Sequence, residues 1–164
     1  MRALVWITES SWQACVDQAR ALVPADADVT LLHVAASDVE YLAGHPGPGR
    51  LGRRRPPPPK GPSVREIGEA EAQALLERAR TRLGRAAQLS ARRGRIEREV
   101  LEAAEDCDLL VLARDGEPRR EPKSVGHYAR FVVDHAGCPV LLVWSEPPPG
   151  LDQMHWPPHL RRDT

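Results

Sequence analysis

The sequence lacks a net charge, a long apolar run and closely spaced cysteines, and each absence excludes a class of protein. Lys and Arg total 23 and Asp and Glu also total 23, so no overall field attracts nucleic acid or an anionic membrane. No stretch approaches the roughly 20 apolar residues that span a bilayer, and the N-terminus does not have the pattern of a signal peptide. We therefore expect a cytoplasmic protein with neither a nucleic-acid nor a membrane partner.

The three cysteines, Cys15, Cys107 and Cys138, lie far apart in the sequence. This spacing argues against a disulfide framework and against zinc, and it fits a reducing compartment. No cluster of His, Cys or carboxylate residues has metal-ligand spacing, so we expect no metal beyond Mg²⁺ that accompanies a nucleotide. Cys138 precedes Pro139 at the start of a predicted strand, and packing explains it better than nucleophilic chemistry does.

Apolar runs and helical spacing alternate along the chain. The runs are typical of strands that are buried on both faces, and they cover residues 2–7, 28–35, 108–113 and 138–144. Helical spacing follows over 12–23 and 126–136, and a long charge-covered helix begins near Ser63, with Ile67 in its apolar stripe. The alternation predicts a three-layer α/β/α sandwich around a mostly parallel sheet.

The segment between Ala86 and Cys107 allows two interpretations. Ile96, Val100 and Ala104 have helical spacing, yet "RIEREV" also alternates like a short edge strand. We favour a strand over 95–98 that continues into a helix over 99–106.

Two segments have compositions that do not suit a packed core. Residues 44–62 hold seven prolines and no aromatic residue, and residues 146–164 form a proline-rich tail. We therefore expect one domain over 1–145 with a flexible insertion at 44–62. The arginines of the insertion fit either a docking segment for a protein partner or a solvated loop, and we favour the loop.

The segments "CDLLVLARDG" and "GHYARFVVDHAGCPVLLVW" resemble the universal stress protein family, and the similarity extends over residues 1 to about 145. After its fourth strand the family has Gly, two residues, Gly, nine residues, and Gly followed by Ser or Thr. In that register this chain has Ala113, Gly116, Gly126 and His127. The resemblance implies a Rossmann-like, five-stranded sheet in the order 3-2-1-4-5 and a homodimer formed through strand 138–144.

The resemblance also implies that ATP or another adenine nucleotide binds in the crevice at the carboxyl ends of the strands. Glycines there let the backbone approach a phosphate. The candidate nucleotide-binding residues are Ile7, Thr8, Val34, Leu112, Ala113, Gly116, Gly126 and His127. The family's residue types are kept at Val34, Gly116 and Gly126. They are changed at Thr8, where the family has Asp, and at Ala113 and His127. His127 either donates to a phosphate or fills its space, and we expect crowding.

The loop after the strand 108–113 carries four cations and three acids. The cations, which are candidate phosphate ligands, are Arg114, Arg119, Arg120 and Lys123, and the acids are Asp115, Glu117 and Glu121. A net charge of one favours an ordinary solvated loop. The resemblance implies a binding or regulatory module in the stress response. A slow ATPase or nucleotide-processing enzyme in the same crevice is one alternative, although no general base or other catalytic residue is evident. A nucleotide-independent interaction scaffold is the other.

Overall fold

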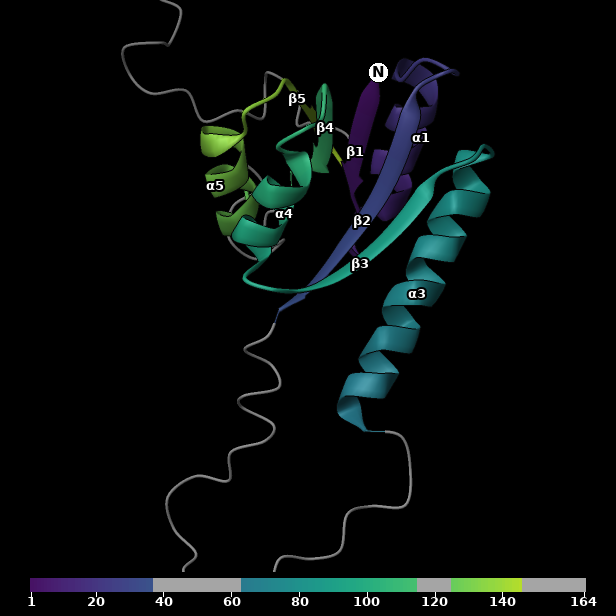
Figure 1. The fold of residues 1–164 in the computed structure, drawn as a ribbon, viewed down its shortest axis with the longest axis vertical. Helices are drawn as coiled ribbons and strands as arrows, with labels where there is room; N and C mark the ends of the chain where they lie inside the picture. Colours follow the sequence, from purple (N-terminus) through teal and green to yellow (C-terminus); the bar gives the residue numbers. More distant parts are fainter. Residues whose placement is uncertain (37–62, 115–124, 146–164) are drawn as a thin grey trace, which may run out of the picture.

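The computed structural model of the protein describes residues 1–36, 63–114 and 125–145. Within these ranges the chain forms one five-stranded parallel sheet in the order β3-β2-β1-β4-β5 (Figure 1). The elements are β1 (Arg2–Trp6), α1 (Trp12–Leu22), β2 (Asp28–Ala36), α3 (Val64–Leu83), β3 (Gln88–Gly94), α4 (Ile96–Ala104), β4 (Leu109–Ala113), α5 (His127–His135) and β5 (Val140–Val143). The predicted fold class and strand order are confirmed. The insertion at 44–62, with its possible protein partner, and the tail at 146–164 lie outside the described residues.

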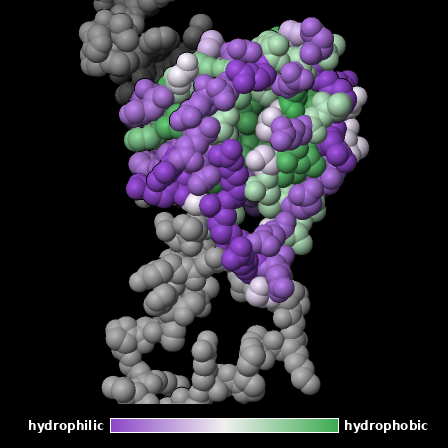
Figure 2. Space-filling model, in the orientation of Figure 1, coloured by the Kyte–Doolittle hydropathy of each residue, from purple (hydrophilic) through white to green (hydrophobic). Residues whose placement is uncertain are grey.

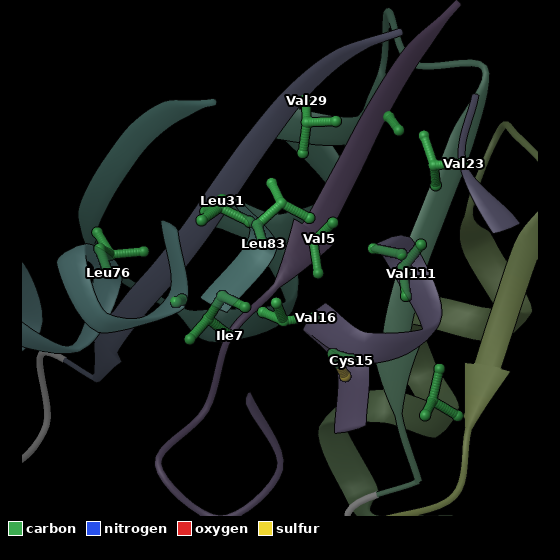
Figure 3. Close-up of a cluster of buried hydrophobic side chains, with 14 of the residues drawn as sticks. Val5, Ile7, Cys15, Val16, Val23, Val29, Leu31, Leu76, Leu83 and Val111 are labelled. Carbon is green, nitrogen blue, oxygen red and sulfur yellow. The ribbon is translucent and has the colours of Figure 1, made fainter. Parts of the chain in front are cut away.

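Helices cover both faces of the sheet, with α1 and α3 on one side and α4 and α5 on the other (Figure 1). Side chains alternate along each strand, so Val5 of β1 joins the core under α1 and α3 while Leu4 joins the core under α4 and α5. Figure 3 shows the first of these two cores, in which Leu31 of β2 lies beside Leu83 of α3. Burial on both faces explains why the central strands are continuous apolar runs.

The surface is less uniform than the two cores. In the view of Figure 2, hydrophilic residues gather over α4 and along the lower half of α3, and hydrophobic residues show between the sheet and α1. None of the helices within the described ranges is both long enough and apolar enough to cross a membrane.

Local signals fix both ends of α3. Ser63 and Glu66 form a capping box: the Glu66 N–H donates to the Ser63 hydroxyl, and the Ser63 N–H donates to the Glu66 carboxylate. The Ser63 N–H and the Ser63 hydroxyl both donate to the Glu66 carboxylate, and these two hydrogen bonds lower the pKa of Glu66. At the other end Gly84 adopts φ of 72°, the left-handed conformation that ends many helices.

The strand predicted over 95–98 was wrong, whereas the helix predicted over 99–106 overlaps the later part of α4. The strand is β3, over Gln88–Gly94, and in "RIEREV" Arg95 is the N-cap of α4 while the other five residues lie in the helix. β3 is an edge strand, paired only with β2 and partly exposed, so its sequence does not need an apolar run. The helical spacing was the correct signal, because Val100 and Ala104 of α4 are buried.

Three apolar side chains of the helices are exposed. Ile67, which was predicted to lie in the apolar stripe of α3, is on the surface, and so are Tyr128 and Phe131 of α5, whereas Val132 of α5 is buried. The Phe131 ring stacks on the His135 ring with centroids 4.1 Å apart. α5 therefore buries a narrower face than its apolar residues suggested.

Candidate functional site

The order of the strands reverses between β1 and β4. From β1 the sheet is built outward through β2 and β3 on one side, and through β4 and β5 on the other. β1 pairs with β2 on one side and with β4 on the other. From its end the chain enters α1 on one face of the sheet, while α5, which follows β4 in the chain, lies on the opposite face (Figure 1). Ligands of open α/β sheets bind at such a switch point. The candidate site is therefore built from the ends of these strands and the starts of these helices.

At the end of β1 two hydroxyls occupy the turn into α1. The Thr8 carbonyl accepts hydrogen bonds from the N–H groups of Ser11, at 3.3 Å, and Trp12, at 3.0 Å. The Oγ1 of Thr8 lies 2.6 Å from the Oγ of Ser11, which is only 2% exposed. Ser11 therefore stands at the N-cap position of α1 without capping it through its side chain. The turn offers uncharged hydroxyls, which both donate and accept.

His33 of β2 joins this turn from the neighbouring strand. Its Nδ1 lies 3.0 Å from the carbonyl oxygen of Ile7, so that nitrogen must carry the proton for the contact to be a hydrogen bond. The Ile7 N–H donates to the Leu32 carbonyl at 2.7 Å, and the Ile7 side chain is fully buried. Val34 is also buried, in the core under α4 and α5. Both predicted apolar residues thus lie at the strand ends with their side chains in the core.

At the end of β4 the predicted residues are packing groups. Leu112 and Ala113 are buried on opposite faces of the sheet, and Ala113 shares the core of α1 with Val111. Its methyl group is therefore directed into that core. The Arg114 N–H donates to the Val143 carbonyl at 2.8 Å, and the Arg114 guanidinium carbon lies 3.9 Å from the centroid of the Trp144 ring. The Arg114 guanidinium thus stacks on the Trp144 ring, just beyond the end of β5.

Gly126 and His127 begin α5. Gly126 is the N-cap residue, with φ of −54° and no side chain to cap the helix, so its role does not depend on left-handed backbone geometry. The His127 side chain is 84% exposed, and its Nε2 lies 3.8 Å from Oε1 of Glu97, whose side chain is 16% exposed. The imidazole therefore lies at the surface, at the start of α5 and beside α4. That this ring crowds a phosphate there stays a prediction.

The remaining predicted residues, Gly116, Arg119, Arg120 and Lys123, lie outside the described residues. Among the residues that the structure does describe, no group of three or more His, Cys, Asp or Glu side chains could hold a metal ion. Sequence reasoning missed Ser11, Glu97 and Trp144. Only Ser11 had a sequence signal, because it follows Thr8 by three residues in a turn.

Comparison with known proteins gives one family. The profile of the Universal stress protein family matches residues 2–143. No curated protein matches the chain.

Solved structures share the fold at low sequence identity. One is a hypothetical protein whose biochemical function was assigned from its structure; it has a TM-score of 0.64 and 18% identity, over 90% of this chain and 98% of that one. A universal stress protein in complex with cAMP has a TM-score of 0.60 and 16% identity, over 89% and 98% of the two chains. A universal stress protein from Archaeoglobus fulgidus, in complex with dAMP, has a TM-score of 0.50 and 17% identity, over 87% and 97%.

Proposed function

Because the chain belongs to the universal stress protein family, we propose that it is a regulatory module of the stress response that binds an adenine nucleotide. The proposed binding site is at the carboxyl ends of β1 and β4. The observation that carries the proposal is the start of α5, which lies beside this switch point and whose N-cap residue, Gly126, has no side chain to cap the first N–H groups. Two proteins of the same fold were solved with cAMP and with dAMP, which supports an adenine nucleotide as the ligand.

The chemistry of the described residues suits such a ligand. The first N–H groups of α5 and the positive end of its dipole favour a phosphate group. Gly126 presents no side chain at this point, so a phosphate can approach the backbone closely. The Thr8 hydroxyl stands after β1, at the position where the family has Asp, and it lies 2.6 Å from the Ser11 hydroxyl. A hydroxyl both donates and accepts, so Thr8 retains hydrogen bonding to the base or sugar without a fixed negative charge.

Thermal unfolding in the presence of nucleotide tests the proposal. A ligand that binds only the folded state stabilises it by about 2.7 kcal/mol at a hundred times its Kd, so millimolar ATP, AMP or cAMP should raise the Tm. Gly126→Leu should abolish the rise, because its side chain enters the space of the phosphate. Gly137→Leu is the matched control, since a β-carbon at Gly137 meets nothing within 4 Å and the residue lies beyond the opposite end of α5. If none of the three nucleotides shifts the Tm of the unmodified chain, nucleotide binding is wrong.

We also propose a homodimer formed through β5. β5 is the outer strand beside β4, with Val140, Leu141 and Leu142 only partly buried and Trp144 exposed just beyond it. An unpaired strand edge is a ready template for a second copy. The support is this exposed apolar edge.

A backbone substitution tests the dimer. The carbonyls of Pro139 and Val143 accept hydrogen bonds from β4, so the N–H of Leu142, between them, points to the free edge. Leu142→Pro removes that donor and should convert a dimer to a monomer in size-exclusion chromatography with light scattering. Leu142→Ala loses the same side chain but keeps the N–H, and it should remain dimeric. A monomeric unmodified chain at every concentration tested would contradict the proposal.

A cytoplasmic location belongs to the same proposal. Its support is that the three cysteines, all within the described residues, are free thiols, as in reducing compartments. Fractionation of cells that express the chain should recover it with a cytoplasmic marker. Recovery with membranes or in the medium would argue against it.

A further inference from the structure

We propose that Cys107 and Cys138 form a thiol pair that closes to an intramolecular disulfide under oxidation. The pair lies at the amino ends of β4 and β5, the end of the sheet opposite to the candidate nucleotide site. It does not depend on nucleotide binding.

Strand pairing brings the two residues to neighbouring positions. β4 and β5 are parallel neighbours in which Leu110 pairs with Val140. Cys107 stands two residues before the start of β4, and Cys138 stands two residues before the start of β5. The two cysteines therefore precede adjacent strands at the same end of the sheet. A disulfide needs Cα atoms roughly 4.4–6.8 Å apart, a range that includes the spacing of about 4.8 Å between paired strands.

Backbone hydrogen bonds hold both strand starts in place. The Leu110 N–H donates to the Pro139 carbonyl at 2.9 Å, directly beside Cys138. The Cys107 N–H donates to the Ala104 carbonyl at 3.0 Å, at the end of α4. The two cysteines are therefore anchored in the sheet and in the end of a helix.

Both thiols lie on the same side of the sheet. Cys107 and Cys138 are partly buried and pack against the core beneath α4 and α5. The Cys107 thiol donates to the Ala103 carbonyl at 3.4 Å in the last turn of α4. Cys15 belongs to α1 and is fully buried in the other core (Figure 3). The sheet thus separates the third thiol from the pair.

The surroundings make the pair slow to react. Burial raises the pKa of both thiols. The pKa of Cys107 is raised further by the charge of Cys138 and of Asp108 and Asp106, and Arg2 opposes this effect. The influence of the Cys138 charge on the pKa of Cys107 agrees with two thiols that precede neighbouring strands. Because the thiolate is the nucleophile, the pair should stay reduced under mild conditions and close under sustained oxidation.

Hydrogen peroxide is a sufficient oxidant for the step. One thiolate, for instance that of Cys107, attacks a peroxide oxygen and the O–O bond breaks, which yields a sulfenic acid and, with the released proton, water. The thiolate of Cys138 then attacks this sulfur, and the S–O bond breaks as a second water leaves. Two thiols lose two electrons and two protons, and one peroxide becomes two waters. A small thiol such as glutathione reverses the step by exchange.

Oxidation of the unmodified full-length chain tests the proposal. After treatment with hydrogen peroxide, thiols counted in denaturant should fall from three to one, and the monomer mass should fall by two hydrogens. Proteolytic mapping should join the peptides of Cys107 and Cys138. The disulfide closes a long loop, so the Tm should rise by about 5–15 °C and return after reduction.

Three serine variants separate the pair from the remaining thiol. Cys15→Ser should still lose two thiols and gain the same Tm shift, whereas Cys107→Ser and Cys138→Ser should lose both effects. Circular dichroism of the reduced variants establishes that each is folded, and the mapping of the unmodified chain does not depend on them. A bridge that involves Cys15, a disulfide between two chains, or three thiols that persist while a urea-unfolded sample oxidises would each overturn the proposal.

Discussion

At the end of α3, the backbone conformation of Gly84 alone should decide how a substitution changes the free energy of unfolding. Gly84 has φ of 72°, and a β-carbon built on it meets nothing within 4 Å. Gly84→Ala therefore adds no clash, and its effect is the left-handed penalty of about 1–2 kcal/mol. Reduced entropy of the unfolded chain offsets about 0.4–1 kcal/mol of this. We expect the free energy of unfolding to fall by about 0.5–1 kcal/mol.

Gly137→Ala is the matched control for this prediction. A β-carbon at Gly137 also meets nothing within 4 Å, but its φ lies outside the left-handed region. The unfolded-state entropy gain is the same for both variants, so Gly137→Ala should be neutral or more stable by up to about 1 kcal/mol. Urea unfolding followed by circular dichroism gives both values. Equal changes in the two variants, or a more stable Gly84→Ala, would refute the conformational argument.

Three further predictions follow from single contacts. Arg82 contacts Asp17 through Nε and Nη2 at 2.8 and 2.7 Å, and both side chains are almost half exposed, so a double-mutant cycle should give less than about 1 kcal/mol of coupling. Because hydrogen bonds from Arg82 lower the pKa of Asp17 in the folded state, this coupling should be complete above pH of about 4 and vanish as the pH falls through the lower folded value; an unchanged coupling at low pH would be inconsistent with it. Leu110→Ala should lower the free energy of unfolding by about 2–5 kcal/mol, since the side chain is fully buried, and a loss below 1 kcal/mol in urea unfolding would contradict its packing. Arg114→Gln should change the fluorescence of Trp144, whose ring lies beneath the guanidinium, and should destabilise the chain by no more than about 1 kcal/mol; an unchanged emission spectrum would count against the stack.

Strands covered on both faces could be predicted from the sequence, and the exposed edge strand could not. β1, β2 and β4 need apolar side chains on both sides, and they are visible as continuous runs. β3 needs few such side chains, because it has a neighbour on one side only. Its sequence, "QLSARRG", therefore has no strand signal of the kind that identified the others. The charged first turn of the helix that follows, α4, was mistaken for the edge strand.

The sequence located the candidate site but not the contacts within it. Thr8, Ala113 and Gly126 all lie at the ends of strands or the start of a helix, as the resemblance implied. The direction of each side chain depends on neighbours from other elements. His127 lies against Glu97 of α4, and the Ala113 methyl is directed into the core of α1. Such contacts join distant segments, so spacing along the chain does not reveal them.

The two proposed sites share one unit of the fold, the segment from β4 to β5. The end of β4 and the start of α5 belong to the proposed nucleotide site, whereas Cys107 and Cys138 precede β4 and β5 at the opposite end of the sheet. A disulfide between these thiols would restrict the unit without touching the crevice, since the bond lies at the opposite end of the strands. Any effect of the disulfide on nucleotide affinity must therefore act through the conformational flexibility of β4 and α5. Linkage then requires reciprocity: if oxidation strengthens nucleotide binding by some factor, bound nucleotide favours the disulfide by that same factor.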